Sequence, residues 1–215
     1  MRKLVVFISG SGTNLQALLD ATAAGALPAT VALVVSNRRD AYGLVRAQQA
    51  GVPTLYFPLR GFLDAGKTRA EYDAALAAAI QPYAPDLIVL AGWMHILSPA
   101  FLNEFPNMVI NLHPALPGQF AGTQAIERAY AAFQRGDISH SGCMVHQVIP
   151  EVDAGPVIAQ TVVPIYPHDT LPDFAARMHA AEHKLLVTAV RQWLSGGAPA
   201  NNAPLFTDPS FTPGH

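Results

Sequence analysis

Residues 3–19, KLVVFISGSGTNLQALL, join an apolar run to a glycine turn and then to a leucine-rich segment. Residues 3–9 are short, apolar and followed by glycine, which is typical of a strand buried on both faces. In residues 14–24, Leu15, Leu18, Leu19 and Thr22 recur at helical spacing. A buried strand followed directly by a helix predicts a parallel sheet covered by helices.

The same alternation continues beyond this unit. Four further apolar runs predict strands at residues 30–36, 53–57, 86–92 and 108–112. Helical spacing predicts helices at residues 41–50, 68–83 and 122–135, and another with Ser98 as its cap and Pro99 in its first turn. Two late runs, 139–149 and 156–163, are close enough to form a hairpin. Residues 170–194 predict a long helix, with Thr170 and Asp173 spaced as a capping box. We therefore predict an α/β fold with a doubly wound, mostly parallel sheet and an antiparallel C-terminal extension.

Length, composition and charge limit the kinds of protein. The chain has 215 residues, 51% of them hydrophobic, which suits one large domain or two lobes sharing a sheet. Its 13 basic and 15 acidic residues give no basic surplus, so we expect no nucleic-acid partner. No apolar stretch reaches membrane-spanning length, so we expect no membrane partner. Cys143 is the lone cysteine and no internal disulfide can form, so we expect a soluble cytoplasmic protein.

The glycine turn after the first strand suits an anion. Its polar and glycine residues, which we call the glycine loop, are Gly10, Ser11, Gly12, Thr13 and Asn14. Free amides at a helix start favour a phosphate. A dinucleotide fingerprint needs a third glycine where this chain has Leu15, and no Gly-Lys-Ser/Thr of a P-loop follows. A monophosphate site and an ordinary turn both remain open. The segment SNRR, residues 36–39, keeps NADP binding as a minor alternative.

The segment NLHPALPGQF, residues 111–120, ends another strand with Asn111 and His113 on one face, because residues two apart point to the same side. An amide can hold a developing oxyanion, and an imidazole can shuttle protons. Pro114 and Pro117 stiffen the loop that follows. A strand-end asparagine with a purely structural histidine is the alternative.

The segment PEVDAGPVIAQ, residues 150–160, supplies a carboxylate. Glu151 and Asp153 lie in a loop tightened by Gly155 and Pro156. Either acid can raise the pKa of a nearby imidazole or hold a water. Both can equally face solvent, and the sequence does not bring Asp153 to His113.

Four segments together resemble the phosphoribosylglycinamide formyltransferase family, the folate-dependent enzymes of purine biosynthesis. They are GSGTNLQAL, AGWMHILSPAF, NLHPALPGQFAG and EVDAGPVI, in the family's order and at similar spacings. The resemblance implies a Rossmann-like formyltransferase fold in one domain over residues 1–195. A phosphate-binding half covers about residues 1–100 and a catalytic half about residues 101–195. The Gly/Pro-rich residues 196–215 are expected to lie on the surface or to be disordered.

The resemblance also implies the reaction. A formyl group passes from 10-formyltetrahydrofolate, a co-substrate, to the amine of glycinamide ribonucleotide, without a metal. These two small molecules are the expected partners, and the expected state is a monomer or homodimer. Asn111 and a protonated His113 are expected to hold the oxyanion, while Asp153 keeps the imidazole charged.

The family's site residues transfer to matching positions of this chain. The catalytic residues are Asn111, His113 and Asp153. The substrate-binding residues are Gly10, Ser11, Gly12, Thr13, Asn14 and Glu182. The folate-binding residues are Arg69, Met94, His95, Ile96, Leu97, Ile149, Pro150, Glu151, Val152 and Asp153.

Two positions depart from the family pattern. Residues 115–118 read Ala-Leu-Pro-Gly where the family usually has Ser-Leu-Leu-Pro, so we expect a different loop conformation. His95 replaces an arginine common in the folate-binding segment, which puts one folate contact in question.

Several other functions are alternatives to formyl transfer to glycinamide ribonucleotide. Related formyltransferases act on methionyl-tRNA or amino sugars, and a formyltetrahydrofolate hydrolase shares the catalytic trio. A non-catalytic nucleotide- or folate-binding module is a further alternative. The segment HAAEH, residues 179–183, matches a zinc protease pattern, with His179 and His183 on one helix face. Polar positions on an amphipathic helix explain it more simply.

Overall fold

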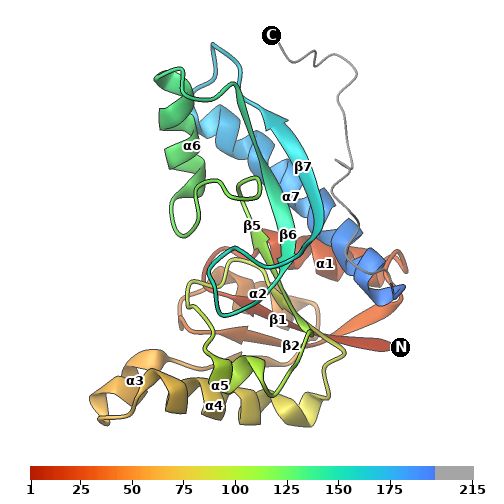
Figure 1. Cartoon of the computed structure of the whole chain (residues 1–215). Coiled ribbons are helices and arrows are strands. Elements are labelled where there is room, and N and C mark those ends of the chain that lie inside the picture. The colour runs from red at the N-terminus through yellow and green to blue at the C-terminus, as the bar shows by residue number, and fades with distance from the viewer. Residues whose placement is uncertain (197–215) are drawn as a thin grey trace.

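The computed structural model describes residues 1–196. A seven-stranded sheet with strand order β3-β2-β1-β4-β5-β6-β7 forms its centre (Figure 1). The strands are β1 (Arg2–Ile8), β2 (Ala29–Ser36), β3 (Thr54–Tyr56), β4 (Leu87–Leu90), β5 (Val109–His113), β6 (His140–Gln147) and β7 (Val157–Pro164). Pairing is parallel from β3 to β5 and antiparallel from β5 to β7. This confirms the predicted mostly parallel sheet with an antiparallel extension.

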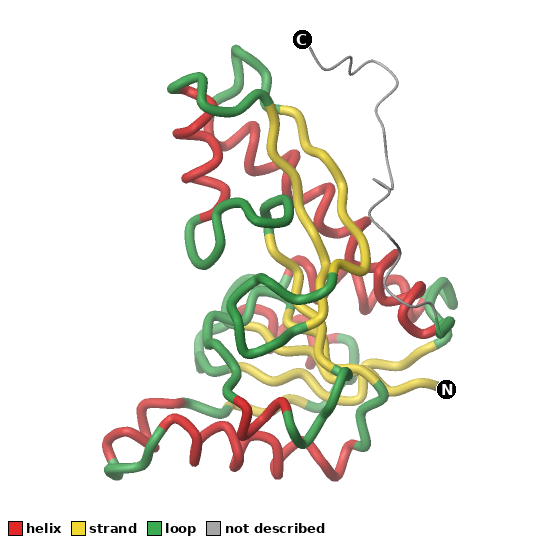
Figure 2. The backbone as a smooth tube through the Cα atoms, viewed as in Figure 1, coloured by secondary structure: helices red, strands yellow, loops and turns green. Residues whose placement is uncertain are grey.

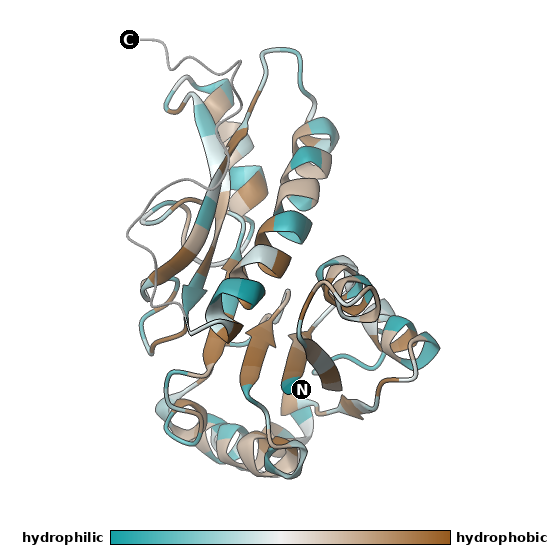
Figure 3. Ribbon diagram, turned by 90° about the vertical axis from the view of Figure 1, so that its right-hand side faces the viewer, coloured by the Kyte–Doolittle hydropathy of each residue, from teal (hydrophilic) through white to brown (hydrophobic). Residues whose placement is uncertain are grey.

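Helices cover both faces of the sheet. They are α1 (Thr13–Ala23), α2 (Tyr42–Gln49), α3 (Leu59–Asp64), α4 (Arg69–Ile80), α5 (Pro99–Leu102), α6 (Ala125–Gln134) and α7 (Leu171–Leu194), with a 3₁₀ turn at Gln81–Tyr83. Figure 1 shows α7 running along β6 and β7, while α3, α4 and α5 lie on the other side of the sheet. Figure 3 shows strands that are mostly hydrophobic between helices that alternate in hydropathy.

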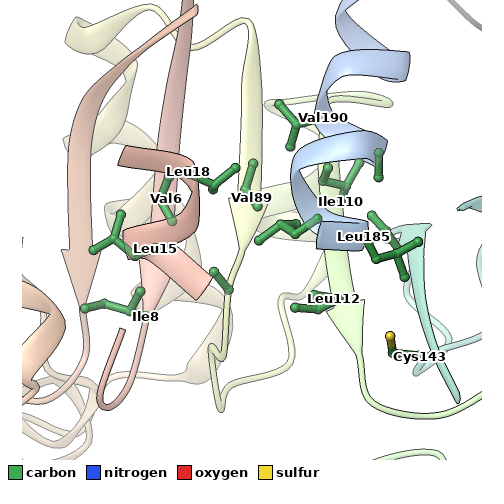
Figure 4. Packing of buried hydrophobic residues seen from close by; sticks show 14 of the residues in the cluster. Val6, Ile8, Leu15, Leu18, Val89, Ile110, Leu112, Cys143, Leu185 and Val190 are labelled. Atoms are coloured by element: carbon green, nitrogen blue, oxygen red, sulfur yellow. The ribbon is translucent and has the colours of Figure 1, made fainter. Parts of the chain in front are cut away.

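Strand β1 shows why both faces are covered. Alternate residues of a strand point to opposite faces. Leu4, Val6 and Ile8 pack into one core with α1 and α7, part of which Figure 4 shows. Val5 and Phe7 pack into a second core with α4 and α5. A strand buried on both sides needs apolar residues throughout, and that continuous pattern made it recognisable in the sequence.

Some helix boundaries differ from the prediction. The helix expected from residue 122 begins at Ala125, because Gly122 and Gln124 have φ values of 84° and 56°, which a helix does not allow. The short helix α3 was not predicted. Ser98 occupies the N-cap of α5, but its side chain makes no capping hydrogen bond. The capping box of Thr170 and Asp173 is confirmed.

The parallel strands end at one edge of the sheet, and Figure 2 shows loops gathered there. This is the edge at which doubly wound sheets bind ligands. Among residues 1–196, no helix is long and apolar enough to cross a membrane. The predicted tail lies outside the described residues from 197 onward. The division into two halves and the oligomeric state stay predictions.

Candidate active site

The end of β5 places Asn111 and His113 on one face of the sheet. The antiparallel register sets Asn111 opposite His146 of β6. Directly opposite residues share a face, so His146 joins the other two. The Nδ2 atom of Asn111 lies 3.2 Å from Nε2 of His146.

Asp153 lies in the loop between β6 and β7. Its carboxylate contacts both this face of the sheet and the loop that contains Gly122. Its Oδ1 atom accepts a hydrogen bond from Asn111 Nδ2 at 3.2 Å and lies 3.4 Å from His146 Nε2. Its Oδ2 atom accepts a hydrogen bond from the Gly122 amide at 2.8 Å and lies 3.4 Å from His113 Nδ1. The structure thus brings together the three residues grouped as a catalytic trio. We call them, together with His146, the Asp153 cluster.

The loop that carries Asp153 is tightly constrained. Asp153 has a left-handed backbone with φ 52°, a conformation that is uncommon outside glycine and concentrated at functional sites. A Cβ atom on Gly155 would lie 1.8 Å from the carbonyl oxygen of Gln147. Only glycine therefore allows this close approach to β6, and the approach turns Asp153 back toward β5.

Burial and charge set the ionisation of the Asp153 cluster. Burial lowers the pKa of His113 below its ordinary value of 6.5, although the Asp153 carboxylate opposes this shift. Burial also disfavours the charged form of Asp153. Hydrogen bonds from His146 and the Gly122 amide, and the attraction of each neighbouring imidazole when it is protonated, outweigh burial and lower the pKa of Asp153. At neutral pH, a carboxylate therefore faces a neutral His113.

One ring nitrogen of His113, Nε2, makes no hydrogen bond to any residue from 1 to 196. The residue is 4% exposed. The backbones of Gln119 and Phe120 come close enough to favour the charged ring, but burial outweighs them. The expectation that His113 is protonated while it holds the oxyanion stays a prediction; the lowered pKa favours the neutral ring, which can accept a proton.

The glycine loop precedes α1, which begins at Thr13. Gly12 occupies the N-cap with φ 70°, a left-handed conformation that glycine adopts without strain. The first amides of a helix lack intrahelical partners, and glycine has no side chain to cap them. A Cβ atom on Gly12 would lie 2.5 Å from Cα of Gly43 in α2, so the loop also needs glycine for this contact.

Helix α7 carries Glu182 and brings one of its residues to the glycine loop. This residue, His183, lines a pocket of about 380 Å³ with Thr13, Gln16, Ala17, Asp20 and Arg46. Glu182 is 5% exposed, and its Oε2 atom lies 2.7 Å from Nδ1 of His179. This hydrogen bond raises the pKa of His179. In residues 1–196, no three His, Cys, Asp or Glu side chains gather as a metal site, so HAAEH forms no three-residue ligand cluster in this part of the chain.

Arg69 holds the predicted folate-binding segment around residue 96. Its guanidinium donates to the Ile96 carbonyl and pairs with Asp73 at 3.1 Å. Asp73 is fully buried and accepts a hydrogen bond from the Ser98 amide at 2.8 Å. Met94 and Ile96 are 58% and 61% exposed. The ion pair, with its buried carboxylate, therefore fixes a segment that presents two apolar side chains to solvent.

Other residues predicted to bind folate are placed differently. Leu97 is 2% exposed, so it can offer a ligand only its backbone. His95 Nε2 lies 2.9 Å from Asn37 Nδ2, and burial, followed by the charge of Arg69, lowers the pKa of His95. A neutral group thus stands where the family commonly has a cation. Residues 149–152 lie in the loop between β6 and β7, where Val152 is 41% exposed.

His146, which is 2% exposed and belongs to the Asp153 cluster, was not predicted from the sequence. The available signal was a histidine directly after the apolar residues Cys143, Met144 and Val145. Its partner became clear only from the register that sets it opposite Asn111. The Gly122 amide was also missed, because no side chain marks a backbone donor.

The fold and the Asp153 cluster define a class of protein. A doubly wound sheet with an amide, an imidazole and a carboxylate at its carboxyl edge is the setting of a small-molecule enzyme with acid–base chemistry. Residues 2–190 match the formyl transferase family. The chain belongs to this family and is therefore a formyltransferase, for which the family implies a folate-derived formyl donor.

Individual relatives show which kind of formyltransferase this chain is similar to. The chain is 48% identical over 197 residues to phosphoribosylglycinamide formyltransferase of Dictyostelium discoideum, covering 87% of this chain and 96% of the relative. It is 50% identical over 197 residues to the enzyme of that name from Schizosaccharomyces pombe, covering 88% and 95%. The crystal structure of glycinamide ribonucleotide transformylase 1 from Symbiobacterium toebii matches with a TM-score of 0.84 at 42% identity, covering 91% of this chain and 89% of that chain. The resemblance found in the motifs is thus confirmed.

Proposed function

We propose that this formyltransferase transfers the formyl group of 10-formyltetrahydrofolate to the amine of glycinamide ribonucleotide, in purine biosynthesis. The observation that carries the proposal is the Asp153 cluster, where Asn111, His113 and Asp153 converge at the edge of the sheet that also carries the glycine loop. The names of the relatives support the choice of acceptor.

The glycine loop is proposed to bind the phosphate of the acceptor. Its amides lie at the start of α1, where the helix dipole favours an anion. Glu182 on α7 is proposed to bind the ribonucleotide. The exposed Met94 and Ile96, with the loop that carries Val152, are proposed to contact the folate.

In the proposed first step, the acceptor amine attacks the formyl carbon and a C–N bond forms. The former carbonyl oxygen becomes an oxyanion, which a hydrogen bond from the second Nδ2 hydrogen of Asn111 stabilises. Nε2 of neutral His113 takes the proton that the amine must lose. The lowered pKa found for His113 supports a neutral base at this point. The imidazolium that forms is then stabilised by the Asp153 carboxylate, 3.4 Å from Nδ1.

The second step breaks the bond to the donor. The oxyanion electrons re-form the carbonyl, and the bond between the formyl carbon and folate N10 breaks with its electron pair going to N10. His113 returns its proton to N10. The products are the formylated amide and tetrahydrofolate, so atoms and charges balance.

A transfer assay with both substrates tests the proposal. Purified protein with 10-formyltetrahydrofolate is given glycinamide ribonucleotide, formyl-accepting methionyl-tRNA, an amino sugar nucleotide, or no acceptor. We expect transfer to glycinamide ribonucleotide at a kcat/KM far above that for the other acceptors, and little hydrolysis without acceptor. Transfer to methionyl-tRNA alone, or hydrolysis that no acceptor accelerates, would refute the proposed acceptor.

A further inference from the structure

The first turns of α2 press against the glycine loop. The Gly43 amide donates to the Gly10 carbonyl at 3.1 Å. The Nε atom of Arg46 donates to the Ser11 carbonyl at 2.9 Å. Two consecutive carbonyls of the loop are therefore held by one helix.

Arg46 is itself fixed on two further sides. Its Nη1 atom donates to Gln16 Oε1 at 3.2 Å, one turn into α1. Its guanidinium lies over the ring of Tyr42, 5.0 Å from the centroid. A planar guanidinium can make such contacts in several directions at once, which an ammonium cannot do. Arg46 thus links α2, the glycine loop and α1 in one arrangement.

Holding the carbonyls also fixes the amides. A trans peptide is planar, and its C=O and N–H point in opposite directions. The described residues contain no cis peptide. Because the carbonyls of Gly10 and Ser11 point to α2, the amides of Ser11 and Gly12 point away from it. With Gly12 left-handed and Thr13 beginning the helix, successive amides form the kind of concave nest that binds anions.

We propose that Arg46 is a positioning residue for the acceptor's phosphate. Arg46 fixes the Ser11–Gly12 peptide so that the amides of the glycine loop are oriented before the phosphate arrives. It acts through the loop, by its hydrogen bond to the Ser11 carbonyl. This inference rests on the proposed function, because it assumes that the glycine loop binds the acceptor's phosphate.

The test compares glycinamide ribonucleotide with its dephosphorylated riboside in wild-type protein and in Arg46→Ala. Loss of a charge-assisted hydrogen bond should lower kcat/KM for the phosphorylated acceptor about tenfold or more, mainly through KM. The value for the riboside and the KM for 10-formyltetrahydrofolate should change less than twofold. General damage to the fold would instead lower kcat/KM for both acceptors alike.

Two further variants sharpen the test. Arg46→Lys keeps the charge without the planar fork and should recover no more than part of the loss. Arg191→Ala is the matched control, because Arg191 Nε also donates to a backbone carbonyl, that of Ala26, at 3.2 Å. It should leave both acceptors unaffected. Melting temperatures show whether each variant is folded.

The outcomes distinguish a wrong role for the glycine loop from a wrong role for Arg46. If wild-type protein does not prefer the phosphorylated acceptor, the proposed role of the glycine loop is wrong. If wild-type protein prefers it and Arg46→Ala keeps the same preference, only the role of Arg46 is overturned. Full recovery by Arg46→Lys would also overturn it, since charge alone would then account for the effect.

Discussion

The Asp153 cluster and the glycine loop lie at the same edge of the sheet but are built in opposite ways. The Asp153 cluster joins side chains from β5, β6 and the loop after β6, and ionisation governs it. The glycine loop is one continuous segment of backbone, and close packing against α2 governs it. The comparison teaches that substitutions at the first should change the rate of the reaction, and at the second the binding of the acceptor.

The largest effect is expected at the Asp153 cluster. His113→Ala removes the proposed proton acceptor and should lower kcat by about 10²–10⁴-fold, with the KM for glycinamide ribonucleotide little changed. Steady-state kinetics with both substrates measure it. His168→Ala, at an exposed histidine, is the control. A rate within a few-fold of wild type would show that His113 does not carry the proton.

The second largest effect is expected when the charge of the Asp153 cluster is removed. Asp153→Asn keeps the shape of the side chain and removes the carboxylate that raises the pKa of His113. We expect kcat to fall about 10²-fold and the acid limb of the pH profile to move to lower pH. Asp40→Asn, at an exposed aspartate, is the matched control. An unmoved acid limb would mean that Asp153 does not act on the ionisation of His113.

A smaller effect is expected at the packing of the glycine loop. A Cβ atom on Gly43 would lie 2.3 Å from Cδ1 of Ile8 and 3.2 Å from Cα of Gly12. Gly43→Ala should therefore destabilise the fold by about 1–3 kcal/mol and raise the KM for glycinamide ribonucleotide more than it lowers kcat. Denaturation and kinetics measure the two effects.

The control is Gly61→Ala in α3, where a Cβ atom would meet no atom of residues 1–196 within 4 Å. It should be neutral or slightly stabilising. If Gly43→Ala lowered kcat and left KM unchanged, the glycine loop would not govern acceptor binding separately from the rate of the reaction.

The smallest effect is that of pH on the wild-type protein. Burial lowers the pKa of folded His113 below 6.5, so the neutral base is present at neutral pH. As pH falls through the lowered pKa, protonation removes the base and kcat/KM should decline. Stability should fall over the same range, because the unfolded chain takes up a proton near pH 6.5 before the folded chain does. Rates and urea midpoints from about pH 5 to 8 check both trends. A kcat/KM that rises on acidification would contradict a neutral base.

Much of the fold was predictable because its signals are local. Continuous apolar runs marked the parallel strands, and period-two geometry correctly placed Asn111 and His113 on one face. The sequence signal for the glycine loop was also local, because strand, turn and helix follow one another directly. Helix α3 was missed because its six residues, LRGFLD, are too few to show a clear helical period.

The arrangement of the Asp153 cluster depended on non-local geometry. Asp153 reaches His113 through the register of an antiparallel hairpin and a left-handed turn, which no short window of sequence encodes. The lowered pKa of His113 depends on burial by residues distant in the chain. The resemblance to the family named the trio, but it gave neither the distances nor the protonation.

The left-handed backbone of Asp153 has a consequence for mutational scanning. A residue with φ 52° costs an alanine roughly 1–2 kcal/mol, whereas asparagine tolerates the conformation. An alanine scan at this position would therefore combine a backbone penalty with the loss of a carboxylate and overstate the importance of the charge. Asparagine is the substitution that separates them, and a library at position 153 should be ranked against it.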